Sequence, residues 1–433
     1  MQIGKAIYQI ATLKPTSQLP SFACLLLLGF FISACSDSKQ DIASIQAEEA
    51  DTAKNTNIIN SERFFTPPKL RDIPLPEDLN NTAVWNGVGI NDEGEVYLGL
   101  SSIQAVDNTA FVISIDPKTQ QIKRHSDAVS QLKQEGVYET GLSQKRLQTD
   151  FIADDDGFIY FATHDRMGMD KSNLSQSGSY LWRMHKGDDN WELLLKTEES
   201  IIAIKKHKQF IFALSFWDHV LYKYDTVSQL SSAIKIGSFP RHFSRKFIID
   251  KRGHIFVPRV EKDIEDQLSV VLVELNTDLA ILDIHPMPDY WNANGLGNHG
   301  IVASTETLEG VTYFTVASGG LYKLEESVSG RSKLDYLGKF EPQLPESYIS
   351  LVIAPEQVPI LVGFGKTKRE SDYYWFIREL STNIVVNYPA TEFDGRFLLY
   401  GANHKRDKSQ IYIVGEQLLE DGISKPVLYK AEH

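Results

Sequence analysis

Cysteine is almost absent from this sequence of 433 residues. Its two cysteines, Cys24 and Cys35, both lie near the N-terminus, in or just after an apolar segment. The chain beyond Cys35 therefore has no thiol, and it can form neither a disulfide nor a cysteine-ligated metal site. Histidines are the remaining nitrogen ligands for a divalent ion, so the sequence leaves the cofactor unknown.

Positive charge is also scarce. The chain carries 44 lysines and arginines against 57 aspartates and glutamates, which gives a formal net charge of −13 at pH 7. This excess of negative charge argues against nucleic acid as a partner. It does not exclude an anionic ligand, because basic side chains gathered in one cleft can override the net charge locally.

One apolar run, Phe22–Ile32, stands in the N-terminal region. It follows a leader whose charged residues, Lys5 and Lys14, are both basic, and it is too short to cross a bilayer as a helix, which takes ~20 residues. The run ends in Ile32-Ser33-Ala34-Cys35, which resembles a bacterial lipobox. A poor transmembrane anchor and an ordinary signal peptide with a chance cysteine are the alternatives.

The lipobox resemblance implies that residues 1–34 are a signal peptide and that Cys35 carries the lipid, with palmitate among its acyl chains. Two or three acyl chains anchor a protein stably, whereas one holds it only marginally. Ser36 follows the cysteine, which favours the outer membrane of a Gram-negative bacterium. We therefore expect the chain to be attached to a membrane through this lipid.

The remaining sequence divides into a tether and a folded body. Ser36–Ser61 is polar, with few aromatic or large aliphatic residues, so it cannot bury enough surface to fold. Phe64–Asp78 is proline-rich, and we expect it to be extended. Residues 35–79 are thus predicted to form the lipidated cysteine, the tether and the extended segment, and residues 80–433 to form one domain.

One strand pattern recurs along residues 80–433. A turn of the type Asp-x-x-Gly precedes alternating aromatic and β-branched residues, as in Asp154–Phe161 and Asp250–Val257. The acidic side chain of such a turn bonds local amides, and the glycine supplies a positive φ. Aligned copies recur every 44 to 63 residues, a spacing typical of propeller blades with loop insertions. Their central residues are Tyr97, Tyr160, Phe212, Phe256, Tyr313, Leu361 and Tyr412.

These copies predict an all-β fold, a seven-bladed β-propeller with four-stranded antiparallel blades. The one short helical candidate is Asp127–Lys133. The last blade supplies three strands, the first of them Arg396–Gly401, and we expect a fourth from the segment before Asn80. Such a strand would close the ring and protect two sheet edges. A long array of β-sandwiches is the alternative fold.

Propellers usually bind ligands near the central channel, at the loops that join blades and at the ends of inner strands. Gln148 and His164 flank one hairpin of the second blade, so we expect them to lie close together at one rim. Basic residues at comparable places would suit a carboxylated or sulfated ligand, because guanidinium groups bind such anions bidentately. Loop hydrogen bonds, ion pairs and turn packing are the structural alternatives for each residue. The further binding candidates are Arg166, Arg241, His242, Arg245, Arg259, Trp291, Asn294, His299 and His404.

Three segments, Gln148–His164, Gly178–Arg183 and Ser244–Arg259, resemble a group of bacterial seven-bladed propellers. That group includes propeller-type polysaccharide lyases, notably the ulvan lyases. In those enzymes an arginine neutralises the uronate carboxylate, and a tyrosine and a histidine act as base and acid in β-elimination. The likeness falls on blades two to four, and half of each motif is ordinary blade turn.

The resemblance implies that Arg259 is the neutralising residue and that His164 is one of two catalytic histidines. Gln148 stands where relatives have the other histidine, and it cannot titrate. Phe243 stands where the tyrosine is expected, with His242 beside it as the substitute base. Either His242 takes that role or the reaction has been lost and the binding groove kept.

The sequence therefore predicts a monomeric surface or periplasmic lipoprotein that binds acidic polysaccharide and cleaves it if the altered site still works. A non-catalytic carbohydrate-binding or scaffold lipoprotein is the first alternative. A metal-dependent lactonase-type hydrolase is the second, and the chain shows no set of Asp, Asn and Glu ligands at corresponding strand starts that would favour it.

Overall fold

The computed structural model describes residues 67–432 except 103–108, 166–177, 240–241, 263–264, 292–299, 306–308, 328–329, 345–346, 355–359, 368–371, 406–409 and 421. Cys35 and the predicted signal peptide and tether lie outside the described residues. The propeller lies within Ser61–His433, which forms a unit of its own. Among the described residues no helix has the length and apolar character needed to cross a membrane.

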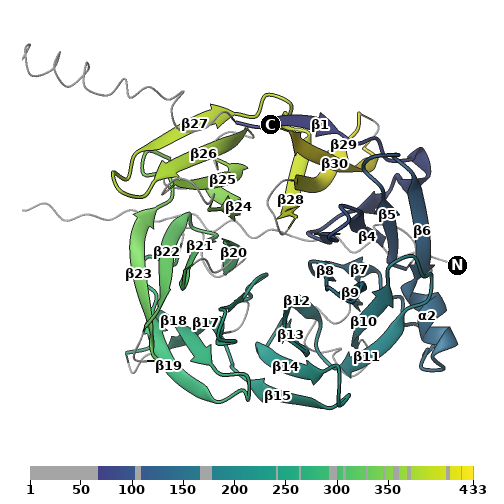
Figure 1. The fold of residues 1–433 in the computed structure, drawn as a ribbon, viewed down its shortest axis with the longest axis horizontal. Helices are drawn as coiled ribbons and strands as arrows, with labels where there is room; N and C mark the ends of the chain where they lie inside the picture. Colours follow the sequence, from purple (N-terminus) through teal and green to yellow (C-terminus); the bar gives the residue numbers. More distant parts are fainter. Residues whose placement is uncertain are drawn as a thin grey trace, which may run out of the picture. The chain divides into compact units, whose positions relative to one another are not determined.

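Seven antiparallel sheets stand in a ring around a central axis, which confirms the predicted seven-bladed propeller (Figure 1). Blades 1 and 2 have an innermost strand broken into two short pieces. Blade 1 contains β2 (Thr82–Ala83), β3 (Val88–Ile90), β4 (Val96–Ser102), β5 (Phe111–Ile115) and β6 (Ile122–Asp127). Blade 2 contains β7 (Arg146–Leu147), β8 (Ile152–Ala153), β9 (Phe158–His164), β10 (Ser179–His185) and β11 (Glu192–Thr197).

The other five blades each have four strands. In blades 3 to 6 these follow the chain from the axis outward. Blade 3 contains β12 (Ile201–His207), β13 (Phe210–Ser215), β14 (Val220–Asp225) and β15 (Ser231–Lys235). Blade 4 contains β16 (Ile248–Ile249), β17 (Ile255–Lys262), β18 (Leu268–Leu275) and β19 (Ile281–Pro286). Blade 5 contains β20 (Ile301–Ser304), β21 (Val311–Val316), β22 (Gly320–Glu326) and β23 (Ser332–Lys339). Blade 6 contains β24 (Tyr348–Ile353), β25 (Ile360–Lys366), β26 (Tyr373–Glu379) and β27 (Val385–Pro389).

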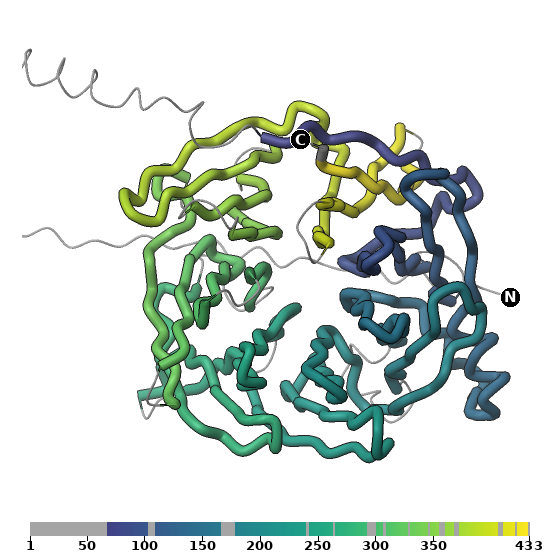
Figure 2. Tube along the Cα trace, in the orientation of Figure 1, coloured from purple at the N-terminus to yellow at the C-terminus, as the bar shows by residue number. Residues whose placement is uncertain are grey.

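Blade 7 is built from both ends of the folded chain. Its inner strands are β28 (Phe397–His404), β29 (Ile411–Leu418) and β30 (Ser424–Glu432), and its outer strand is β1 (Lys69–Asp72). β1 pairs antiparallel with β30, Lys69 opposite Glu432, so the segment before Asn80 closes the ring as predicted. Figure 2 shows this N-terminal segment running along the outside of the last blade.

In the part of the chain that the structure describes, two short helices lie outside the sheets. The helix α2 (Ala128–Gln134) confirms the predicted helical candidate, and the carboxylate of Asp127 caps it by accepting from the Ser130 amide at 2.9 Å. The 3-10 helix η2 (Glu77–Leu79) follows the closing strand.

The recurrent strand is the second strand of each blade, because the seven aligned residues fall on β4, β9, β13, β17, β21, β25 and β29. The turn before it has the predicted chemistry. In blade 2 the carboxylate of Asp154 accepts from the Phe158 amide at 2.9 Å, and Gly157 has a φ of +82°. In blade 4 Asp250 accepts from the His254 amide at the same distance.

The hydrophobic core is divided among the interfaces between neighbouring blades. Alternation along β9 explains this, since successive side chains of a strand point to opposite faces of its sheet. Phe161 packs between blades 1 and 2, whereas Tyr160 and Ala162 pack between blades 2 and 3. The same alternation orients His164, at the end of β9, toward blade 3.

Candidate functional site

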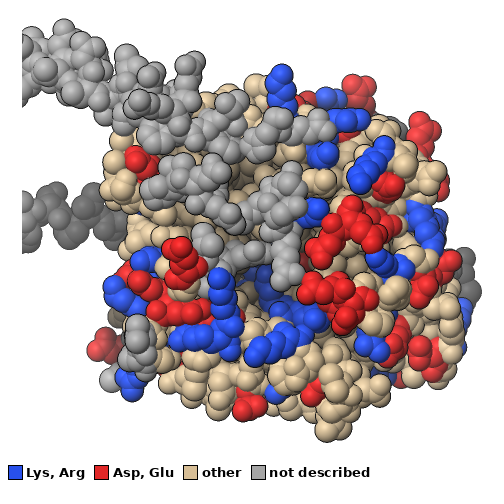
Figure 3. Space-filling model, in the orientation of Figure 1, with Lys and Arg blue, Asp and Glu red and all other residues tan. Residues whose placement is uncertain are grey.

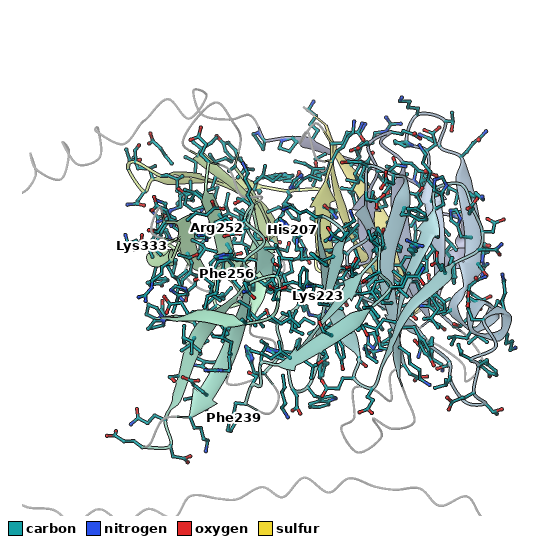
Figure 4. All side chains as sticks on the ribbon, turned by 60° about the horizontal axis from the view of Figure 1, so that its bottom comes forward. His207, Lys223, Phe239, Arg252, Phe256 and Lys333 are labelled. Carbon is teal, nitrogen blue, oxygen red and sulfur yellow. The ribbon has the colours of Figure 1, made fainter. Side chains whose placement is uncertain are left out.

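The central channel has two ends, which the direction of the innermost strands distinguishes. We call the end where these strands begin the loop rim, and the end where they turn into the second strands the turn rim. Figure 4 shows the two rims, with His207 and Arg252 at the turn rim and Phe239 at the opposite end of the blades. Gln148, His164 and Arg245 belong to the loop rim, because they lie near inner-strand starts or at the end of a second strand.

The prediction that Gln148 and His164 share one rim agrees with their positions in blade 2. Arg146, two residues before Gln148, is the direct ladder partner of His164. Gln148 itself is buried, in the break between β7 and β8. His164 therefore lies at the end of β9, and Gln148 lies two residues past its ladder partner, in the break of the neighbouring innermost strand.

His164 is fully buried, and among the described residues only one of its two ring nitrogens has a hydrogen-bond partner. Its Nδ1 lies 3.3 Å from the carbonyl oxygen of Asp165, and since a carbonyl only accepts, Nδ1 carries the proton. Its Nε2 is then an acceptor, and it has no hydrogen-bond partner in the described part of the chain. Burial lowers the pKa of His164 to about 3, and the charges of Arg146 and Arg245 add to the shift.

Arg245 extends from the start of blade 4 to the middle of the loop rim. The positive charge of Arg245 lowers the pKa of His164 in blade 2. Burial raises the pKa of Tyr348 in blade 6 and of Tyr400 in blade 7, and the charge of Arg245 opposes both of these increases. One guanidinium can act on groups of three other blades only if it lies close to the axis. Among the described residues no carboxylate pairs with Arg245, whose guanidinium lies 5.6 Å from the ring of Phe243.

Aromatic rings accompany these guanidinium groups. Arg146 lies over the ring of Trp85 at 4.6 Å, a cation–π contact that holds the charge at the mouth of the channel. Trp85, Tyr348 and Tyr400 are all half-buried, so part of each side chain is open to solvent. The loop rim thus joins two guanidinium groups with three aromatic side chains from blades 1, 6 and 7.

Deeper in the channel, an ion pair joins blade 4 to blade 2. Lys246 Nζ lies 3.2 Å from Asp150 Oδ2, and the two side chains are only 13% and 14% exposed. The other carboxylate oxygen, Oδ1, accepts from Asn86 Nδ2 at 2.8 Å. Asn86 and Asp150 occupy the breaks in the innermost strands of blades 1 and 2, so side chains of three blades meet there.

His242, the predicted substitute base, lies away from the channel mouth. It is 1% exposed, its Nε2 lies 2.7 Å from the Tyr290 hydroxyl, and its Nδ1 lies 2.7 Å from Ser238 Oγ. Burial raises the pKa of Tyr290 well above its usual range. The ring of His219, which no sequence motif selects, lies 5.0 Å from that of His242.

His219 resembles His164 in its surroundings. Nδ1 donates to the carbonyl of Pro258 at 3.0 Å, which leaves Nε2 as a buried acceptor without a partner among the described residues. Burial lowers its pKa to about 4. Its position in the turn between β13 and β14 shows no periodic or motif signal, so only the fold reveals it.

Arg259, the predicted neutralising residue, already has an anion beside it. Its Nη2 donates to Glu261 Oε2 at 2.7 Å. Phe243, at the position of the expected tyrosine, stacks on Phe216 with ring centroids 4.8 Å apart. The structure therefore places an ion pair and an aromatic stack at two positions where the resemblance implies catalytic groups.

The remaining candidate residues do not lie together. Trp291 is half-buried and contacts Tyr290 edge-on at 5.5 Å, in the same group as His242. The strand β28 does not end at Gly401, as predicted, but continues to His404. His404 therefore lies at the turn rim, away from the other candidates. Arg166, Arg241, Asn294 and His299 lie outside the described residues.

The turn rim contains a cavity of about 630 Å³, lined by residues from the innermost strands of all seven blades. Figure 3 looks onto this rim and shows lysine and arginine side chains gathered in the central hollow beside a patch of acidic side chains. This basic cluster was not predicted from the sequence. Its lysines are Lys205, Lys206, Lys208, Lys246 and Lys251.

No protein-family model matches the chain, and no curated protein is significantly similar to it. Solved structures do match. YCF48 from Cyanidioschyzon merolae is 10% identical with a TM-score of 0.53, over 84% of this chain and 99% of that one. The β-propeller domain of the Trilobed protease from Pyrococcus furiosus is 11% identical with a TM-score of 0.48, over 82% and 96%. The first likeness shows a shared propeller fold and extends no further.

Proposed function

We propose that this protein binds acidic polysaccharide, with uronate or sulfate groups, at the loop rim of its propeller. The observation that carries the proposal is the position of Arg245, a guanidinium near the axis with no carboxylate partner among the described residues. In a chain with a net charge of −13, such a cation is a local exception to the overall field.

The chemistry of the rim fits this ligand class. Arg245 and Arg146 offer the planar donor pairs that match carboxylate and sulfate oxygens. The rings of Trp85, Tyr348 and Tyr400 offer apolar faces for sugar rings between the charges.

Cleavage by β-elimination has less support than binding. The step needs a base that removes the C5 proton while the bond from C4 to the leaving oxygen breaks, and that base must reach the sugar. His164 and His242 are 0% and 1% exposed, and neither Gln148 nor Phe243 can take a proton. We therefore propose binding as the function and treat elimination as a separate test.

Attachment to the outer membrane through lipid on Cys35 belongs to the same proposal. A Cys35→Ala variant is expected to lose the incorporation of labelled palmitate and to leave the membrane fraction. Palmitate labelling that persists in the variant would contradict the lipid anchor.

Affinity electrophoresis of residues 61–433 in gels that contain ulvan, alginate, pectate or chondroitin sulfate tests the proposed ligand. Retardation by at least one polymer is expected, and Arg245→Ala should weaken it about tenfold, since a hydrogen bond to a charged group contributes ~1.5–3 kcal/mol. Arg396→Ala is the matched control, because Arg396 is exposed and paired with Asp394. Equal mobility in every polymer would overturn the proposal and leave the scaffold alternative.

A further inference from the structure

The cavity at the turn rim has charges of opposite sign on different walls. Its lysines come from blades 3 and 4, whereas Asp92 comes from blade 1 and Asp150, Asp154 and Asp155 from blade 2. Asp250, which lies on the lysine side, is paired with Arg252. In Figure 3 basic side chains gather in the central hollow, and acidic side chains flank it. A ligand with one kind of charge would therefore meet attraction on one wall and repulsion on the other.

Part of this charge is already paired inside the cavity. Lys206 lies 3.6 Å from Asp154, and Lys246 is paired with Asp150. Lys208 and Lys251 are exposed, and no carboxylate pairs with either of them in the part of the chain that the structure describes. These two ammonium groups stand at the ends of adjoining hairpin turns, so together they form a cationic edge.

The lining of the cavity is largely polar, with a few half-buried isoleucines among the charged and polar groups. These are Ile90, Ile152 and Ile249, from three different blades. The ion pair of Lys246 and Asp150, which also lines the cavity, lies nearer the strand starts and hence at its inner end. The result is a cup with a largely polar wall and floor, with Lys208 and Lys251 on one side of its outer edge and Asp92 on the other.

We propose that this cup is a second binding site, for a short peptide with a free amino and a free carboxyl end. Its carboxylate would pair with Lys208 and Lys251, its ammonium group with Asp92, and its small side chains with the half-buried isoleucines. The volume lies within the range of roughly 300–1,000 Å³ that small-ligand sites have. An extended tripeptide, roughly 10 Å long, is of suitable size. This site is separate from the arginines of the loop rim and does not depend on them.

Isothermal titration calorimetry of residues 61–433 with trialanine tests the proposal. Trialanine is expected to bind, and either N-acetylation or C-amidation of the peptide should weaken binding about tenfold, as the loss of one charge-assisted contact does. The Lys208→Ala/Lys251→Ala variant should weaken trialanine binding to the same degree but leave the amidated peptide unaffected. Asp92→Ala should also weaken trialanine binding about tenfold, but it should leave binding of the acetylated peptide unaffected.

Lys333→Ala is the matched control, because Lys333 is exposed on the outer strand β23 and does not line the cavity. Retardation by polysaccharide should be unchanged in the lysine variant, and trialanine binding should be unchanged in Arg245→Ala. Failure of the peptide proposal can therefore be told apart from failure of the polysaccharide proposal. Two results would overturn the proposal: no heat of binding with trialanine, or stronger binding of the dicarboxylate succinate than of trialanine, which would indicate a simple anion site.

Discussion

Lys246 and Asp150 form an ion pair that joins blade 4 to blade 2 across the channel and passes over blade 3, with Nζ 3.2 Å from Oδ2. Every hydrophobic core cluster lies between neighbouring blades, so this contact links parts of the ring that do not otherwise pack together. Neither residue belongs to a regular strand. Asp150 lies in the break of an innermost strand, and Lys246 lies just before β16.

We expect Lys246→Met to lower the free energy of unfolding by about 1–3 kcal/mol, because it leaves the largely buried carboxylate of Asp150 without its cation. The double variant Lys246→Met/Asp150→Leu should lose less than the sum of the single variants, since it removes both charges together. Urea unfolding measures all three values. Lys333→Met, at an exposed lysine, should change stability by less than ~0.5 kcal/mol. Additive losses would show that the pair does not stabilise the ring.

Stability is expected to fall in mild acid because two buried histidines stay neutral in the folded protein. The pKa is about 3 for His164 and about 4 for His219, whereas a histidine in the unfolded chain titrates near ~6.5. Between these values the unfolded chain binds protons that the folded chain does not. The stabilising contribution is therefore complete above pH ~6.5 and is lost as the pH falls toward the folded values, by up to ~1.4 kcal/mol per pH unit for each histidine.

Denaturant unfolding between pH 7.5 and 5 checks this, since most carboxylates stay ionised over that range. The slope of unfolding free energy against pH should decrease in His164→Gln and decrease further in His164→Gln/His219→Gln. Comparing slopes separates the titration from any constant packing cost of the substitutions. Parallel curves for the wild type and the double variant would contradict the neutral state of these histidines.

The propeller could be predicted from the sequence because its signal is local. The turn at Asp154 and Gly157 requires only hydrogen bonds within four residues, and the strand after it shows the period of two that a sheet imposes. The site could not be predicted to the same extent. Whether a residue such as His404 faces the loop rim or the turn rim depends on where its strand ends, which the alternating pattern does not show.

The basic cavity was missed for a related reason. Lys205 and Lys206 follow the buried stretch of β12 and have the pattern of the polar end of an ordinary strand. Only the packing of blade 3 against blade 4 brings them near Lys246 and Lys251, which are some forty residues away along the chain. Conversely, Arg259 matched a motif in the correct strand, but nothing in that motif indicated that Glu261 would pair with it.

Ring closure by the N-terminal segment has a direct consequence for stability. Ile73, next to β1, is 6% exposed within the core between blades 7 and 1, and its amide donates to the Leu428 carbonyl at 2.8 Å. Ile73→Ala should cost about 2–4 kcal/mol, the usual range for deletion of a buried aliphatic side chain. Ile281→Ala, at a side chain that is 47% exposed, is the control and should cost much less.

Deletion of residues 61–73 extends the same test, because it removes β1 and leaves the edge of β30 unpaired. Thermal unfolding of this variant should begin at a clearly lower temperature than that of residues 61–433. An unchanged melting temperature would mean that the closing strand contributes little to the stability of the ring.

Substitution of Arg245 and substitution of Arg259 should have different effects on binding of a uronate polymer. If binding at the loop rim is the function, Arg245→Ala should weaken retardation by the polymer about tenfold, whereas Arg259→Ala should have a smaller effect because Glu261 already neutralises that guanidinium. Glu261→Gln would release Arg259 and should strengthen binding. Each effect should diminish as salt is added, since the Debye length falls to ~3 Å at 1 M.

An elimination assay on the same proteins separates binding from catalysis. β-Elimination leaves a 4,5-unsaturated uronate, whose conjugated double bond absorbs in the ultraviolet, and we expect no such product from the wild type. If the product does form, and Arg259→Ala reduces its rate by the ~10²–10³-fold that loss of one electrostatic stabiliser costs, then Arg259 rather than Arg245 receives the carboxylate. In that case His242→Ala should also abolish the rate, because the pair of His242 and Tyr290 would be the remaining source of a base.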